Sequence, residues 1–378
     1  MSFKKIYFPN LNGLRFIAAF LVIIHHMVQF KSINGIQTSW DKISSIDMIG
    51  KLGVVLFFVL SGFLITYLLL IEEKRFKKIS IKQFYIRRAL RIWPLYFFLL
   101  LLAFFVLPNI DVFRVADYGT DVLHTNLVWR LLLCLIFLPG ISFYLFGLVP
   151  YASHTWSIGS EEQYYLIWPV LLKYFKTHRM LLITSIIIFY VGIRFLLASP
   201  YANLIPFHTI VGAYWQSFPI SCMAIGGLYS ILYFQKNPVL KYLVRNDIFY
   251  ISTTLACILM IIGVYIPFFQ YEFYSALFGL IILNFSVNDK IRITLENRVL
   301  NYLGKISYGL YMYHPIAISL AISIGLMLGL NTNWFFYPVS MSITIVMAGL
   351  SYEYFESFFL KYKTRYSKVL SGNTIDKG

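Results

Sequence analysis

The sequence predicts an all-α membrane protein, a polytopic helix bundle of about ten transmembrane helices plus one short re-entrant or interfacial segment. Of its 378 residues, 59% are hydrophobic and only 13% are charged, against roughly 25% charged residues in an ordinary soluble domain. Apolar runs of helical length recur along the chain, and the alternating ten-residue pattern of a membrane β-barrel is not seen. The composition therefore indicates a bundle of spanning helices.

Ten apolar segments are interpreted as spans, with ends accurate to a few residues. They cover residues 12–30, 50–71, 92–107, 163–176, 180–198, 211–234, 248–267, 271–287, 302–328 and 334–360. A further run, 131–138, has only eight residues, too few to cross the hydrocarbon core, so we expect it to be re-entrant or interfacial. This predicts one membrane domain, residues 1–360, and a short basic tail, 361–378.

The charges of the loops predict the topology. The segment between the second and third spans carries eight Lys and Arg against two acids, so it should be cytoplasmic. Ten spans place the basic groups at 176–179, 236–245, 290–298 and in the tail on the same side, and leave the acidic segment 108–127 outside. Both termini are therefore predicted to be cytoplasmic. The first span contains Arg15 and two histidines without a small-residue cleavage site, which favours a retained helix over a signal peptide.

The formal net charge of +16 does not indicate nucleic-acid binding. The basic residues occur in short loops between spans, where the positive-inside bias and anionic lipid headgroups account for them. Cys134, Cys222 and Cys257 lie in apolar segments without paired spacing, so neither a metal site nor a disulfide framework is predicted. Membrane lipids are the expected surroundings.

Arg15 and His26 are the first candidate site residues. They are eleven positions apart in the first span, so on a helix they return to within about 20° of each other. His25 lies about 80° off that stripe, which favours His26. A histidine in a membrane can act as a general base or can join two helices by a hydrogen bond. An ionisable pair inside a span favours function, because burying such groups in lipid is unfavourable.

A second candidate group lies in the segment 154–169, HTWSIGSEEQYYLIWP, at the start of the fourth span. Glu161 and Glu162 fall near a helix N-terminus, which by itself favours carboxylates. The predicted topology also places them on the same side as His26, where a carboxylate could orient the imidazole. His154 is a weaker candidate in the same segment.

A third group is FYIRRALRIWPLYF, residues 84–97. Arg88 and Arg91 are three apart and share a helix face at the predicted cytoplasmic entrance of the third span. Guanidinium groups suit phosphates, whereas plain positive-inside anchoring explains Arg87, Arg88 and Arg91 as bare charges. No P-loop or GxGxxG motif occurs.

Three smaller signals remain. Ser61 and Gly62 favour close helix packing. Arg194 either snorkels near an external helix end or is functional. His314 precedes Pro315 in the ninth span, where a proline frees backbone groups, so a functional site and a simple kink are equally supported.

Taken together, five stretches in the right order resemble the acyltransferase-3 family of bacterial membrane acyltransferases, over nearly the whole chain. They are an Arg-x10-His pattern at Arg15 and His26, an FFVLSGFLIT-like span at 57–66, an RRxxRIxPxY run at 87–96, a WSLxxEEQFY-like segment at 156–165 and an SYxLYLxHxP-like element at 307–315. Gly159 and Ser160 replace the commoner Ser-Val of the fourth stretch.

The resemblance implies an O-acyltransferase of the bacterial cytoplasmic membrane that uses acetyl-CoA as acyl donor and no metal. The acceptor would be a hydroxyl of a cell-surface or lipid-linked glycan. It assigns the essential set to His26, Glu161, Arg15, Arg88 and Arg91. Secondary candidates are His25, Glu162, Trp156, Ser157, His314 and Arg194. Longer members carry an SGNH hydrolase-like domain, which is not expected here, so acceptor choice would reside in the membrane domain or a partner.

The resulting hypothesis places the coenzyme A phosphates on Arg88 and Arg91. His26 acts on the acceptor hydroxyl as general base or serves as a transient acyl carrier, Glu161 orients it and Arg15 lines the path. A transporter or flippase of a small metabolite or lipid-linked sugar is the main alternative, and a membrane scaffold is a third. No paired, interrupted half-helices of an inverted repeat are visible, which disfavours a transporter. The sequence carries no signal for the oligomeric state.

Overall fold

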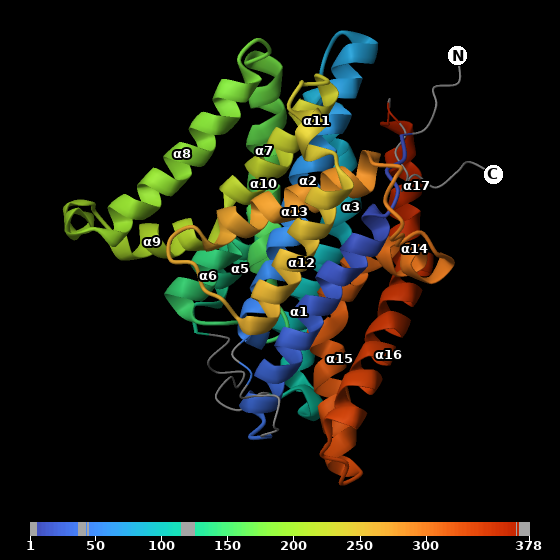
Figure 1. Ribbon diagram of the computed structural model, residues 1–378. Coiled ribbons are helices and arrows are strands. Elements are labelled where there is room, and N and C mark those ends of the chain that lie inside the picture. Colours follow the sequence, from blue (N-terminus) through green and yellow to red (C-terminus); the bar gives the residue numbers. More distant parts are fainter. Residues whose placement is uncertain (1–5, 37–42, 44, 115–124, 368, 370–378) are drawn as a thin grey trace.

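The computed structural model describes residues 6–36, 43, 45–114, 125–367 and 369. Asp117 and Asp121 of the predicted acidic segment, and residues 370–378 of the predicted tail, lie outside them. The described chain is an all-α bundle (Figure 1), which confirms the predicted fold class. Seven of its helices are long and apolar enough to cross a membrane.

Each of the ten predicted spans corresponds to one helix or to two or three consecutive helices. The predicted spans that match a single helix are α1 (Leu11–Ile33), α2 (Ser45–Phe76), α7 (Trp156–Tyr174), α8 (Arg179–Ala198), α12 (Asn246–Ile262) and α13 (Gln270–Val287). Of these, α7, α12 and α13 are not among the seven membrane-length apolar helices. The composite spans are α3 (Ile81–Leu101) with the π-helical turn η2 (Leu102–Val106), α9 (His208–Ser217) with α10 (Ile220–Phe234), α14 (Arg298–Lys305) with α15 (Ser307–Met327), and α16 (Asn333–Leu350) with the π-helical turn η7 (Ser351–Glu356) and α17 (Ser357–Arg365).

The predicted short segment 131–138 forms the end of the short helix α5 (Leu127–Leu135) and the turn that leads to a second short helix, α6 (Pro139–Phe146). Arg130 joins them by donating hydrogen bonds to the carbonyls of Phe146 and Gly147. Neither helix is long enough to cross a bilayer, as expected from the sequence. Their depth in the membrane remains a prediction.

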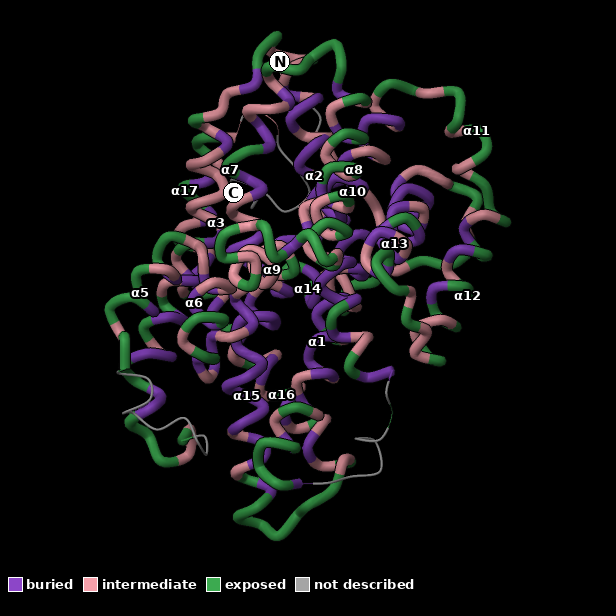
Figure 2. The backbone as a smooth tube through the Cα atoms, turned by 90° about the vertical axis from the view of Figure 1, so that its left-hand side faces the viewer, coloured by how far each residue is buried: buried purple, intermediate pink, exposed green. Residues whose placement is uncertain are grey.

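The core of the bundle is formed by α1, α2, α10 and α15, whose buried residues are drawn in purple in Figure 2. Small residues let the backbones of α2 and α10 approach closely. A Cβ atom on Gly62 would lie 1.9 Å from the carbonyl oxygen of Met223, and one on Gly226 would lie 2.1 Å from that of Val59. This supports the helix-packing interpretation of Gly62.

Buried ion pairs connect helices that are distant in sequence. Glu72 of α2 accepts a hydrogen bond from Arg87 of α3 at 3.0 Å. Arg194 of α8 lies 2.7 Å from Glu272 of α13. The Glu272 carboxylate also accepts a hydrogen bond from the Ser221 hydroxyl, so Arg194 is held in a buried structural network.

The basic segments gather at one end of the bundle. The turns that follow α2 and α7, and the short helix α11 (Leu240–Leu243), lie in the upper part of Figure 1 with α17, whereas the α15–α16 turn lies at the lower end. This arrangement agrees with the prediction, made from the loop charges, that these basic segments lie on one side of the membrane.

Candidate active site

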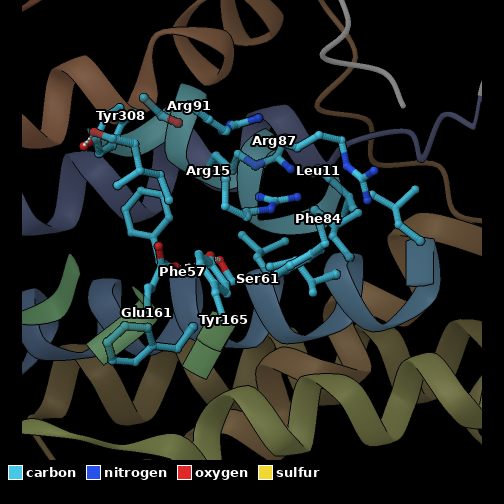
Figure 3. Close-up of a pocket in the computed structure, with 18 of the residues that line it drawn as sticks. Leu11, Arg15, Phe57, Ser61, Phe84, Arg87, Arg91, Glu161, Tyr165 and Tyr308 are labelled. Atoms are coloured by element: carbon cyan, nitrogen blue, oxygen red, sulfur yellow. Dashed lines mark hydrogen bonds between the residues drawn. The ribbon is translucent and has the colours of Figure 1, made fainter. Parts of the chain in front are cut away.

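A polar cavity opens between α1, α2, α3, α7, α15 and α17, with a volume of about 180 Å³ (Figure 3). Its basic side chains are Arg15, Arg87, Arg88, Arg91 and Lys363. The only carboxylates among its described lining residues are Glu72 and Glu161. We call this space the arginine cavity. Its basic residues come from α1, α3 and α17, so no single stretch of sequence builds it.

Most of the positive charge in the arginine cavity has no carboxylate partner among the described residues. Arg87 is neutralised by Glu72, and Arg15 donates a hydrogen bond to Asn12 at 2.8 Å. Arg88 lies over the Phe84 and Tyr165 rings, 5.6 Å and 5.5 Å from their centroids. Its buried Nε has no hydrogen-bond partner among the described residues.

Beyond the Arg87–Glu72 pair, four basic groups therefore share the cavity with one carboxylate, that of Glu161. Charged groups inside a membrane domain are unfavourable unless something balances them. Clustered guanidinium groups, one of which has an N–H donor without a described acceptor, fit an anionic ligand that carries phosphates.

Glu161 lies on the opposite side of the cavity from the arginines in Figure 3, beside Ser61 and Tyr165. Ser61 donates a hydrogen bond to the Glu161 carboxylate at 2.6 Å, and Tyr165 donates to Ser61 at 3.2 Å. Ser157, Glu161 and Tyr165 are four residues apart, so they share one face of α7. The structure thus places Glu161 in the arginine cavity, whereas the sequence predicted that it orients His26.

His26 contacts a different group of residues. Its Nδ1 atom lies 2.9 Å from Nε2 of His314 and 3.1 Å from the carbonyl oxygen of Val22. The His154 ring centroid lies 6.4 Å from that of His26 and 5.1 Å from that of His314. We call His26, His154 and His314 the histidine cluster; it joins α1, the 3₁₀ turn η5 (Ser153–Thr155) and α15.

Tyr311 separates the histidine cluster from the arginine cavity. It lines the cavity together with Ser157, and the two hydroxyls lie 2.7 Å apart. The Tyr311 hydroxyl also donates to the carbonyl of His154 at 2.8 Å, and its ring centroid lies 5.8 Å from that of His314. Because Tyr308, Tyr311 and His314 are spaced by three, one face of α15 runs from the cavity into the cluster.

The other predicted candidates make no hydrogen bond to His26 among the described residues, although the His25 ring packs edge-to-face on that of His26, with 5.1 Å between the centroids. His25 points toward Asp47, with 3.5 Å between Nδ1 and the carboxylate. Glu162 accepts a hydrogen bond from the indole of Trp93 at 2.8 Å. Trp156 packs edge-to-face on Phe58.

Sequence reasoning missed Lys363 and Tyr311. Lys363 was counted in the basic tail, but α17 packs against α3 and directs this buried lysine into the cavity. Tyr311 is one of many tyrosines, and its sequence signals are its place in the element at 307–315 and its spacing of three from His314. Within the described ranges, no group of three or more His, Cys, Asp and Glu side chains is arranged to hold a metal ion.

The chain is similar in sequence to several known proteins. The chain is 32% identical over 188 residues to the peptidoglycan O-acetyltransferase OatA of Listeria monocytogenes, which covers 48% of this chain and 27% of that protein. It is 28% identical to a Staphylococcus aureus (strain COL) protein over 95% of this chain and 58% of the relative. It is 26% identical to the O-acetyltransferase OatA of S. aureus (strain NCTC 8325), over 93% of this chain and 57% of that protein.

The chain thus spans little more than half the length of the S. aureus relatives. No solved structure gives a significant match. The family model described as an acyltransferase domain matches residues 8–353, a range that contains the histidine cluster and every basic residue of the arginine cavity except Lys363. The chain therefore belongs to the acyltransferase-3 family.

Proposed function

We propose that this protein is a membrane O-acetyltransferase that moves an acetyl group from acetyl-CoA to a hydroxyl of a cell-surface or lipid-linked glycan. The observation that carries the proposal is a cavity in which four basic groups have no ion-pair partner among the described residues, beside a cluster of histidines. Family membership supplies the reaction class. The name of the Listeria relative makes peptidoglycan the first acceptor to test.

The arginine cavity would bind the coenzyme A part of the donor. Arg88 and Arg91 offer guanidinium forks to its phosphates, and Lys363 adds a point charge. Apolar lining residues such as Leu64 and Phe57 suit the acyl-bearing arm. The arm would run toward Tyr311 and Ser157, and the contact between these two hydroxyls would open to admit the acetyl group.

His26 would carry the chemistry. As general base, its Nε2 takes the proton of the acceptor hydroxyl while the oxygen attacks the thioester carbonyl. The carbon–sulfur bond then breaks, and the coenzyme A thiolate receives the proton. In the second route that the geometry permits, Nε2 itself attacks the thioester carbonyl, and the carbon–sulfur bond breaks to release the coenzyme A thiolate. The acceptor hydroxyl then attacks the acetyl carbon, the bond to Nε2 breaks, and the proton of the hydroxyl passes to the thiolate. Trapping of a labelled protein distinguishes the two routes.

Glu161 takes a role that differs from the one predicted. Its carboxylate accepts a hydrogen bond from the Ser61 hydroxyl and lies in the same cavity as the arginines. We infer that it organises the donor cavity and balances part of its charge before acetyl-CoA binds.

The proposed location is the bacterial cytoplasmic membrane, with both termini on the cytoplasmic side. Support comes from the basic turns that gather at the end where α17 lies and from the positive-inside rule. The arginine cavity would then face the compartment that supplies acetyl-CoA.

The test uses purified protein in lipid vesicles, radiolabelled acetyl-CoA, and either peptidoglycan fragments or lipid-linked saccharides. We expect release of coenzyme A thiol that depends on acceptor, with label appearing on the glycan. Label on neither protein nor glycan, with a folded wild-type protein and each acceptor supplied, would reject the proposed function in favour of transport.

A further inference from the structure

We propose that His314 is a positioning residue for His26, and that Pro315 in turn makes the carbonyl available that positions His314. The His26–His314 pair takes the place of the Glu161–His26 pair that the sequence predicted. This inference rests on the proposed function of His26 as the reactive imidazole, but the hydrogen-bond pattern that carries it comes from the geometry alone.

The first step fixes the proton on His26. Its Nδ1 atom has two neighbours, the Val22 carbonyl at 3.1 Å and Nε2 of His314 at 2.9 Å. A carbonyl can only accept a hydrogen bond, and the contact with Val22 is a hydrogen bond only if Nδ1 of His26 is protonated, so we assign the proton to Nδ1. The free lone pair of the neutral ring is then on Nε2. This is the atom that a base or an acyl carrier needs.

The second step fixes the proton on His314. Because Nδ1–H of His26 is a donor, Nε2 of His314 has to be an acceptor, and the proton of the neutral His314 ring is therefore on its Nδ1. That Nδ1 atom is buried and has no hydrogen bond of good geometry. The carbonyls of Leu310 and Tyr311 stand one turn earlier in α15.

The third step explains the proline. In a regular helix the N–H of residue 315 would donate to the carbonyl of residue 311. Pro315 has no N–H, so the carbonyl of Tyr311 is left without its usual donor. His314 stands immediately before the proline, three residues after that carbonyl in the same helix. The dipeptide His314–Pro315 therefore supplies both the imidazole and the acceptor that sets its tautomer.

The arrangement also explains how charge is handled. Glu161 hydrogen-bonds in the arginine cavity and Asp47 faces His25, and no hydrogen bond joins a carboxylate to His26 in the described part of the chain. When Nε2 of His26 takes a proton, the Nδ1 proton can move to Nε2 of His314. The positive charge is then shared by two rings.

The test compares His314→Ala and His314→Gln with His208→Gln, a change at a half-buried histidine of α9 that belongs to neither the arginine cavity nor the histidine cluster. We expect His314→Ala to lower kcat by about 10²-fold with an unchanged KM for acetyl-CoA. The amide oxygen of Gln can accept a hydrogen bond from Nδ1–H of His26, so kcat of His314→Gln should lie between those of His314→Ala and wild type. His208→Gln should leave kcat unchanged. A His26→Ala/His314→Ala double variant should be no slower than His26→Ala, since the two residues act as a unit.

Pro315→Ala is the second variant. It restores the N–H that competes for the Tyr311 carbonyl, so we expect a more stable helix together with a lower kcat. Pro338→Ala in α16, also a proline inside a helix, is the control and should not change kcat. If Pro315→Ala and Pro338→Ala behave alike in kcat, the role of the proline is refuted.

A readout without activity separates this inference from the proposed function. His26→Ala, His314→Ala and the double variant that combines them are compared in thermal unfolding. A His26–His314 hydrogen bond predicts that the Tm shifts of the two single variants do not add up to that of the double variant. Additive shifts would overturn the pair whether or not the enzyme turns over. Coupled shifts in a protein that never transfers acetyl would reject the proposed function and keep the pair. Coupled shifts with wild-type kcat in His314→Ala would reject the positioning role and keep the proposed function.

Discussion

The arginine cavity and the histidine cluster lie on either side of Tyr311, yet they handle charge in opposite ways. The cavity concentrates permanent positive charge that one carboxylate only partly balances. The cluster contains groups that can be neutral, hydrogen-bonded to each other and to backbone carbonyls. Unbalanced guanidinium groups in a membrane domain are best explained by an anionic ligand, whereas neutral imidazoles suit proton or acyl transfer.

The difference divides the reaction between two places. If the cavity binds the donor and the cluster performs the chemistry, substitutions in the two regions should affect different kinetic constants. Substitutions that change both constants equally would show that the two regions are not distinct.

The largest effect is expected for His26→Ala. Loss of the reactive imidazole should lower kcat by about 10² to 10⁴-fold, while the Kd for acetyl-CoA stays within about twofold of wild type, because His26 does not line the arginine cavity. Turnover is followed by thiol release and binding by equilibrium dialysis. Wild-type turnover in this variant would exclude both catalytic routes.

Arg88→Ala should give the reverse pattern. Removal of a guanidinium group that hydrogen-bonds to a charged phosphate is expected to weaken acetyl-CoA binding by about 10- to 100-fold. The kcat at saturating acetyl-CoA should be largely retained. The affinity of Arg88→Lys for acetyl-CoA should fall between those of wild type and Arg88→Ala, since lysine keeps the charge but lacks the planar guanidinium group. The control is Arg245→Ala, because Arg245 pairs with Asp247 in an exposed turn. Equal binding by the Arg88 and Arg245 variants would argue against the donor site.

Lys363→Ala should have a smaller effect of the same kind. A single point charge at the cavity should contribute about three- to tenfold to the affinity for acetyl-CoA, decreasing as salt is raised. Lys361→Ala is the matched control, since Lys361 is exposed on the same helix. If both lysines behave alike, α17 is not part of the donor site.

Glu161→Gln is expected to have the smallest effect and sharpens the comparison between the two regions. The amide oxygen can still accept the Ser61 hydrogen bond, and removal of one negative charge should change the KM for acetyl-CoA by a few-fold. A large loss of kcat with unchanged KM would instead support the pairing with His26 that the sequence predicted.

Much of this arrangement could be predicted from the sequence, but not the partners across helices. Hydropathy and loop charge predicted the helices and the gathering of basic turns, because the bilayer imposes both. Helical spacing predicted that Arg15 and His26 lie on one stripe of the first span. It could not show that Glu161 would contact Ser61 and that His314 would contact His26, because those contacts depend on how α1, α7 and α15 pack.

Two other residues illustrate the same limit. Arg194 was a candidate site residue, but Glu272, which lies 78 positions later in the chain, pairs with it. Lys363 looked like part of a solvated tail, because composition does not reveal that α17 folds back along α3. In each case the interaction is made by residues that local sequence patterns cannot relate.

The most direct measurement determines acetyl-CoA binding and acetyl transfer on the same vesicle preparations of wild type, His26→Ala and Arg88→Ala. The division between cavity and cluster predicts that His26→Ala binds the donor normally but does not transfer, and that Arg88→Ala transfers at saturating donor but binds weakly. Loss of binding in His26→Ala to the level of Arg88→Ala, or normal transfer by His26→Ala, would contradict it.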